Sequence, residues 1–171
     1  MATLQANPGT SWAEKSTARD GTPSLIRQQL VDLLNEDLAR EYQAIIAYVV
    51  YSQILKGAQY MTIADELENH ARQELEHALV IAKQINYLGG MPTVMPKPVK
   101  ISDDPEAMLR LDLNNENETV RNYQERVRQC EALGEFATAE HIRKILVNEQ
   151  EHQIDLANAL GQAVGEVMSS L

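Results

Sequence analysis

The sequence has little cysteine, few bulky aromatic residues and no long apolar run. Its 171 residues include one cysteine, one phenylalanine and one tryptophan. A lone cysteine, Cys130, cannot form a disulfide within the chain, and no apolar run reaches the roughly 20 residues that a transmembrane helix needs. No segment has the apolar core of a signal peptide. We therefore expect a cytoplasmic protein with no intrachain disulfide and no membrane partner.

Basic residues are also scarce. The chain has 15 basic against 25 acidic residues, a formal net charge of −10. This charge repels nucleic acid and attracts small cations. Lys15 and Arg19, the two basic residues of segment 1–23, are balanced by Glu14 and Asp20. We therefore predict no binding of nucleic acid.

The residues that are abundant favour helices. Leucine, alanine, glutamate and glutamine have high helix propensity, so we predict an all-α protein. The length is that of one domain. Residues 1–23 are small and polar without a helical apolar stripe, which predicts a flexible N-terminal arm. Residues 24–171 are predicted to form one helical domain, with Ser24 as the first N-cap.

Apolar residues recur at helical spacing in four segments that end near glycines. The pattern predicts helices over about 24–57, 57–89, 103–134 and 134–161. Segment 91–102 contains three prolines and no helical pattern. In extended form, at roughly 3.3 Å per residue, it reaches about 40 Å, enough to cross a bundle. We predict an antiparallel four-helix bundle with a long crossover between its second and third helices.

Each predicted helix carries one glutamate within its apolar stripe: Glu41, Glu74, Glu116 and Glu149. Four buried carboxylates repel one another and take up protons unless positive charge lies among them, and bound divalent cations supply such charge. Glu41 lies 16 residues before Gly57 and Glu74 lies 17 residues after it, so these two glutamates are expected to face each other.

Two of these glutamates belong to Glu-x-x-His motifs, Glu74 with His77 and Glu149 with His152. On a helix this spacing places both side chains on one face, where they can reach one metal ion. Two metal ions would then have six protein ligands: Glu41, Glu74, His77, Glu116, Glu149 and His152. Carboxylates with one imidazole per metal suit iron or manganese better than zinc or calcium, and we choose iron.

With this ligand set the chain resembles the ferritin-like di-iron superfamily, and within it the bacterioferritins. The resemblance covers about 25–160. Its further motifs are Leu34-Asn35, Ala44, Ile45, Tyr48, Ala78, Met108-Leu109-Arg110, Asp112-Leu113 and Ile145-Leu146. It implies a ferritin-like bundle with an intrasubunit ferroxidase centre that oxidises Fe(II) with O2 or H2O2. It also implies iron storage in a homo-oligomeric cage of 12 or 24 subunits.

Carried over to this sequence, the resemblance makes the six candidate ligands the ferroxidase centre, with Glu74 and Glu149 bridging the metals. Tyr48 matches a tyrosine beside that centre, where it could donate an electron or a hydrogen bond, although it could equally be a core residue. Leu75 replaces the methionine that ligates haem in bacterioferritins, so we expect no haem. Asn69 and Gln73 replace ligands of an inner-surface iron site, which we expect to be missing.

Two alternatives stay open at this point. One is a di-metal peroxidase or oxidase without mineral storage, similar to rubrerythrin or manganese catalase, although the sequence has no Cys-x-x-Cys of the rubredoxin type. The other is a stress-protective Dps-like shell, although segment 24–56 lacks the histidine that such shells carry on their first helix.

Other polar or reactive residues are expected to have structural roles. His70 and His141 fall on the inward stripes and are predicted to be core residues or neighbours of the ligands. Cys130 is predicted to be a buried structural thiol. The remaining tyrosines are assigned to packing or to an interface between subunits, without a chemical role: Tyr42, Tyr51, Tyr60, Tyr87 and Tyr123. Four glutamates off the stripes are predicted to be surface charges: Glu68, Glu76, Glu140 and Glu151.

Overall fold

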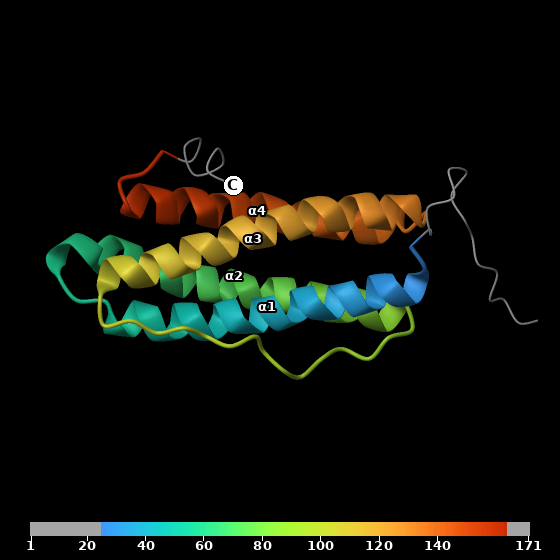
Figure 1. The fold of residues 1–171 in the computed structure, drawn as a ribbon, viewed down its shortest axis with the longest axis horizontal. Helices are drawn as coiled ribbons and strands as arrows, with labels where there is room; N and C mark the ends of the chain where they lie inside the picture. Colours follow the sequence, from blue (N-terminus) through green and yellow to red (C-terminus); the bar gives the residue numbers. More distant parts are fainter. Residues whose placement is uncertain (1–24, 164–171) are drawn as a thin grey trace, which may run out of the picture.

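The protein is described by a computed structural model, which covers residues 25–163 and contains four long helices (Figure 1). Their bounds are α1 Arg27–Ile54, α2 Met61–Tyr87, α3 Pro105–Ala132 and α4 Phe136–Ala159, with a short 3-10 helix η1 at Ala58–Tyr60 before α2. No strand occurs within these described residues, and the predicted all-α fold is confirmed.

The helices form two hairpins, α1 with α2 and α3 with α4, which lie side by side along the bundle (Figure 1). The segment between α2 and α3 runs the length of the bundle beside α1, as predicted (Figure 1). Hydrogen bonds attach it there: the Lys97 amide donates to the Ala39 carbonyl at 2.9 Å, and the Gln43 side chain donates to the Pro98 carbonyl at 2.7 Å.

The helix ends follow local chemistry. Gly89 and Gly134 have φ values of 88° and 76°, a left-handed conformation that favours glycine and ends α2 and α3. Asp104 caps α3 by accepting a hydrogen bond from the Glu106 amide at 3.1 Å. At the other end of the chain, α1 begins at Arg27; the predicted cap at Ser24 and the predicted arm 1–23 lie outside the described residues.

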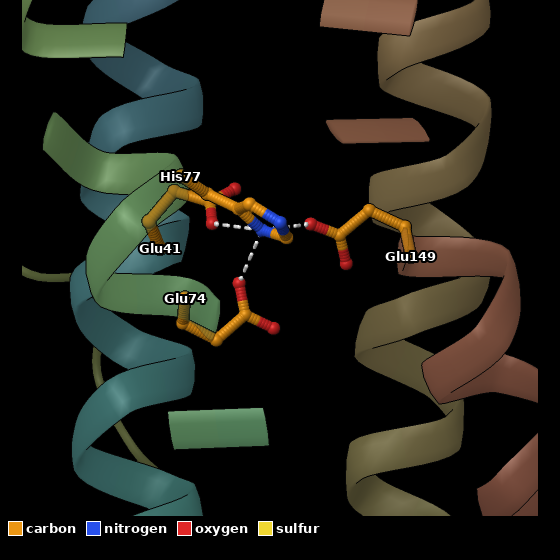
Figure 2. A group of neighbouring side chains, drawn as sticks. All are labelled: Glu41, Glu74, His77 and Glu149. Carbon is orange, nitrogen blue, oxygen red and sulfur yellow. Dashed lines mark hydrogen bonds and ion pairs between the residues drawn. The ribbon is translucent and has the colours of Figure 1, made fainter. Parts of the chain in front are cut away.

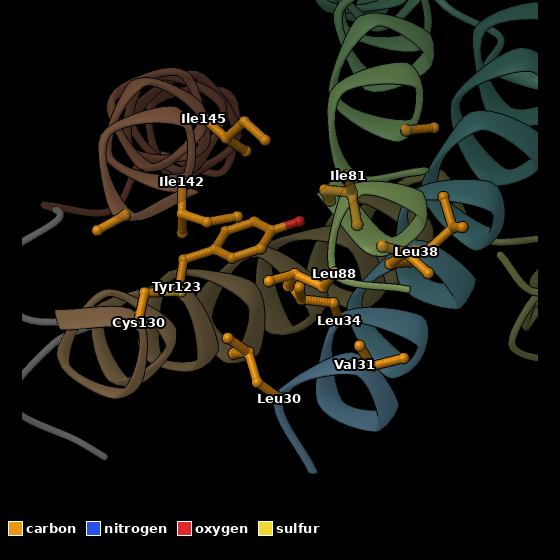
Figure 3. Packing of buried hydrophobic residues seen from close by; sticks show 13 residues of the cluster. Leu30, Val31, Leu34, Leu38, Ile81, Leu88, Tyr123, Cys130, Ile142 and Ile145 are labelled. Atoms are coloured by element: carbon orange, nitrogen blue, oxygen red, sulfur yellow. The ribbon is translucent and has the colours of Figure 1, made fainter. Parts of the chain in front are cut away.

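Two apolar clusters fill the two ends of the bundle. One gathers the start of α1, the end of α2, the end of α3 and the start of α4, and includes Leu34, Ile81, Tyr123 and Ile142 (Figure 3). The other gathers the opposite halves of the same helices. The buried glutamates and histidines lie between the two clusters, so the middle of the bundle is its polar region. None of the helices in the described part is both long and apolar enough to cross a membrane.

The burial predictions for Cys130 and for the four glutamates off the stripes hold, and the prediction for His141 does not. Cys130 is buried, and Glu68, Glu76, Glu140 and Glu151 are exposed, as predicted. His141 was expected on the inward stripe and is exposed, so this prediction was wrong. Thr138, Ala139 and Ile142 occupy the inward positions of this turn of α4, and each residue rotates about 100° around the helix axis. His141 is therefore directed outward.

Candidate metal centre

All six candidate ligands meet halfway along the bundle. Glu41 comes from α1, Glu74 and His77 from α2, Glu116 from α3, and Glu149 and His152 from α4. None of the six residues is more than 4% exposed. The periodicity that aligns the apolar residues of each helix also aligns these polar ones, so burying the stripes brings them together.

The ring of His77 lies among three carboxylates from three helices (Figure 2). Its Nδ1 atom is 2.9 Å from Glu149 Oε1, 3.1 Å from Glu74 Oε2 and 3.4 Å from Glu41 Oε2. On the other side of the cluster, His152 Nδ1 is 3.0 Å from Glu74 Oε1 and 3.6 Å from Glu149 Oε2. Each imidazole therefore directs its Nδ1 atom at the carboxylates.

The cluster divides into two overlapping groups of donor atoms. Glu41, Glu74, His77 and Glu149 form one group, and the donor atoms within it lie within 4.8 Å of one another. Glu74, Glu116, Glu149 and His152 form the second group within the same limit. A cation bonded at about 2.1 Å to each donor draws its donors to within about 4.2 Å, so small side-chain shifts suffice. Glu74 and Glu149 belong to both groups.

Many polar atoms of this cluster lack a hydrogen bond. Of nine such buried side-chain atoms in the described part of the chain, six belong to it: Glu41 Oε2, Glu74 Oε1, Glu116 Oε2, both oxygens of Glu149, and His152 Nδ1. Buried polar atoms in native proteins are nearly always paired, so this concentration calls for a specific explanation. A cavity of about 30 Å³ beside the four glutamates leaves room for small species. The donor set and its unpaired oxygens fit two divalent cations.

Comparisons with known proteins agree with this geometry. The family model of the ferritin-like domain matches residues 31–164. The chain belongs to this family. A ferritin-like, di-iron-carboxylate protein from Bacillus anthracis str. Ames has a similar structure, with a TM-score of 0.75, 32% identity, and coverage of 78% of this chain and 96% of that one.

Two further relatives place this ferritin-like chain near the bacterioferritins. A bacterioferritin from Brucella melitensis biotype 1 is 23% identical over 141 residues, which cover 78% of this chain and 88% of the relative. The bacterioferritin-related protein of Bacteroides fragilis, described as a dodecameric thioferritin, has a TM-score of 0.74 at 27% identity. That match covers 86% of this chain and 93% of the other.

In this ferritin-like protein two side-chain amides hold the histidines. His152 Nε2 lies 2.7 Å from Gln73 Oε1, and His77 Nε2 lies 3.4 Å from Asn148 Oδ1. An amide oxygen can only accept, so each Nε2 carries the hydrogen and donates it. In the neutral ring this leaves the Nδ1 lone pair for a metal. Gln73 thus contacts a candidate ligand, a role that the sequence pattern did not predict.

Two tyrosines contact the two lone glutamates. The Tyr48 hydroxyl donates to Glu116 Oε1, which agrees with the expected place of Tyr48 beside the cluster. The Tyr123 hydroxyl donates to Glu41 Oε1. Assigning Tyr123 to packing alone was therefore incomplete, because its ring belongs to an apolar cluster while its hydroxyl orients a candidate ligand.

An internal repeat could have revealed Tyr123 and Asn148. Position 116 lies 75 after position 41, and position 149 lies 75 after position 74. The same offset relates His77 to His152, Tyr48 to Tyr123, and Gln73 to Asn148. The two hairpins therefore contribute equivalent residues, and each tyrosine crosses to the glutamate of the other hairpin.

Burial has the largest effect on the titration of the cluster. It raises the pKa of Glu41 and of Glu116 well above the ordinary value, and the charges of Glu74 and Glu149 raise it further. Burial lowers the pKa of the imidazoles, but the negative charge of the adjacent carboxylates, Glu149 foremost, outweighs it. This charge raises the pKa of His77 far above its usual range and that of His152 to about 9. Without metal, these shifts favour protonated Glu41 and Glu116 and charged imidazoles.

Proposed function

We propose that this protein is an iron-storage and detoxification protein with ferroxidase activity, whose two-iron centre oxidises Fe(II) with O2 or H2O2. The observation that carries the proposal is the pair of overlapping, buried carboxylate and histidine groups with unpaired oxygens. Membership of the ferritin-like family and similarity to a di-iron-carboxylate protein support it. Iron supplies the redox chemistry, and further ferrous iron is the substrate.

The six candidate ligands would bind two cations. Glu41 and His77 would bind one cation, and Glu116 and His152 the other. Glu74 and Glu149 would bridge, since both belong to each group. The tyrosine hydroxyls orient Glu41 and Glu116, and the amides of Gln73 and Asn148 hold the imidazoles with Nδ1 toward the metals.

Metal binding is expected to release about two protons per divalent cation near pH 7, because the ligands must become ionised glutamates and neutral imidazoles. A raised pKa means that a group keeps its proton to higher pH, so protons compete with metal. Affinity should rise with pH through about 9, the pKa of His152, and beyond it, because His77 keeps its proton to still higher pH. Anaerobic titration with Co²⁺ in weakly buffered solution measures the release. A release below about half a proton per ion would contradict the proposed protonation states.

Tyr123→Phe is expected to weaken metal binding by about 10- to 100-fold, because Glu41 loses the donor that orients it. The ring stays in place, so the apolar cluster should pack as before. Co²⁺ affinity measured by calorimetry checks this. Tyr87→Phe is the matched control, since Tyr87 is 71% exposed and should leave the affinity unchanged. Equal affinities in all three proteins would show that Tyr123 has no role in metal binding.

Storage requires an assembly, and we propose a homo-oligomeric cage. The outer side of α1 and α2 exposes apolar side chains that an interface between subunits would cover: Ile46, Val49, Leu75 and Leu79. A relative described as dodecameric supports this proposal. Leu75 is 52% exposed and has no atom that can ligate iron. The chemistry of this residue therefore still favours the absence of haem at this position, which stays a prediction.

The direct test is aerobic loading of the full chain with a large excess of ferrous iron, followed by size-exclusion chromatography with light scattering and iron analysis. A shell-sized particle that retains far more than two irons per subunit is the expected result. A small oligomer that stops at two irons would contradict storage and favour a di-iron oxidase or peroxidase. A protein that retains no iron would contradict the centre itself.

A further inference from the structure

We propose that Glu66, His70 and Asp155 form a third metal site, for one exchangeable divalent cation, next to the dinuclear centre. The three donor atoms lie within 4.8 Å of one another. His70 Nε2 is 3.3 Å from Asp155 Oδ2 and 3.8 Å from Glu66 Oε1. One imidazole and two carboxylates form a donor set for Fe²⁺, Mn²⁺ or Zn²⁺. None of these residues belongs to the dinuclear centre, so the inference goes beyond the proposed function.

The three residues combine a buried anchor with two accessible ligands. His70 is only 1% exposed, and its Nδ1 atom makes no hydrogen bond. The side chains of Glu66 and Asp155 are 43% and 41% exposed, so water can complete the coordination of a cation between them. Such a site exchanges its ion readily, unlike a fully buried one.

Glu66 and Asp155 line a pocket of about 460 Å³ between the first turns of α2 and the last turns of α4, which lie at the same end of the bundle (Figure 1). Its other lining residues are uncharged: Gln59, Thr62, Ile63, Asn158 and Ala159. Two carboxylates with no basic residue among the described lining make this pocket attractive to cations.

His70 lies between the pocket residues Glu66 and Asp155 and the dinuclear centre. The His70 ring stacks on the ring of His152 with a centroid separation of 4.0 Å and an interplanar angle of 29°. His70 precedes Glu74 by one helical turn on α2, and Asp155 follows His152 by one turn on α4. A cation held by His70 and Asp155 is therefore one ring away from the candidate ligand His152. This position suits an ion passing between the pocket and the centre.

Packing does not require a histidine at position 70. In the 75-residue repeat the counterpart of His70 is Ile145, a buried apolar residue. The counterparts of Glu66 and Asp155 are His141, which is exposed, and Val80. The bundle thus fills the equivalent space in the other half with an aliphatic side chain. The donor set at the pocket is therefore present in only one half of the repeat. This argues that His70 does more than fill the core.

The test is anaerobic calorimetric titration of ferrous iron into the full-length metal-free protein and into Glu66→Gln/Asp155→Asn. We expect three ions per subunit in the unchanged protein and two in this variant. Glu68→Gln/Glu140→Gln removes two exposed charges elsewhere on α2 and α4 and should keep three. Two ions in both the unchanged protein and the variant would overturn the third site and leave the dinuclear centre standing.

Anomalous scattering from crystals soaked in Mn²⁺ locates the ions independently. A peak between His70 and Asp155 that disappears in Glu66→Gln/Asp155→Asn is the expected result. If the only peak lies at this position, the third site stands and the dinuclear centre fails. Peaks confined to the dinuclear centre would overturn the third site.

Discussion

Replacing Glu41 and Glu116 together by glutamine is expected to abolish rapid oxidation of ferrous iron. Each glutamine keeps the shape and the acceptor oxygen that faces its tyrosine, but removes one negative ligand from each cation group. We expect the initial rate, followed by stopped-flow absorbance of ferric product, to fall by more than about 100-fold. Rapid oxidation that persists in this variant would contradict the assignment of the centre.

A stability measurement separates loss of the site from loss of the fold. The metal-free centre holds four buried glutamates, and Glu41 and Glu116 must take up protons to be buried there, because their pKa values are raised. Glutamine is neutral at every pH and removes this cost. The free energy of unfolding of the metal-free variant should therefore rise, by about 0.5 to 2 kcal/mol. Glu68→Gln/Glu140→Gln is again the matched control and should change neither rate nor stability. A variant less stable than the parent would indicate that the glutamates have a structural role.

Breaking the Asp37–Arg126 ion pair is expected to have the largest effect on stability. Arg126 Nε lies 2.6 Å from Asp37 Oδ2, and Nη2 lies 3.1 Å from Oδ1, so the pair is bidentate. Both residues are buried, and burial raises the pKa of Asp37. Asp37→Ala leaves the guanidinium buried without its carboxylate, which should cost about 3 to 5 kcal/mol in chemical unfolding at matched protein concentration.

Removing both charges provides the control for this pair. Asp37→Leu/Arg126→Met replaces the two side chains with apolar ones and should recover most of the loss, because no unpaired charge is left. The ion pair lies one turn from Glu41, so ferrous oxidation in the double variant tests whether the effect stays structural. A cost below about 1 kcal/mol for Asp37→Ala would show that the guanidinium finds other partners.

The helices and the six candidate ligands were predictable because both depend on periodicity. A stripe that must be buried carries Glu74 and His77 with it, so the sequence places them inward without knowledge of neighbouring helices. His141 shows the limit of this reasoning. It lies next to the buried stripe, and the angle of about 100° between consecutive residues of a helix directs it outward. Sequence periodicity alone does not resolve positions at the border of a stripe.

Contacts between helices were not predictable in the same way. Tyr123 reaches Glu41, and Asn148 reaches His77, across distances of 82 and 71 residues in the sequence. The constant offset of 75 residues identifies which residues of the two hairpins have equivalent roles. It does not identify the residue that each one contacts, because that depends on how the two hairpins pack. The site formed by Glu66, His70 and Asp155 likewise combines two helices, and neither helix carries a recognisable motif for it.

The sequence by itself determined that the chain forms four amphipathic helices, that a carboxylate interrupts each apolar stripe, and that each Glu-x-x-His pair presents both side chains on one face of its helix. These properties follow from helical spacing and from the cost of burying charge. Only the tertiary structure decided which side chains orient the candidate ligands, where a pocket opens and which carboxylates belong to both groups. Those features depend on the rotation and separation of packed helices, which are set by side-chain interlocking between segments far apart in the chain.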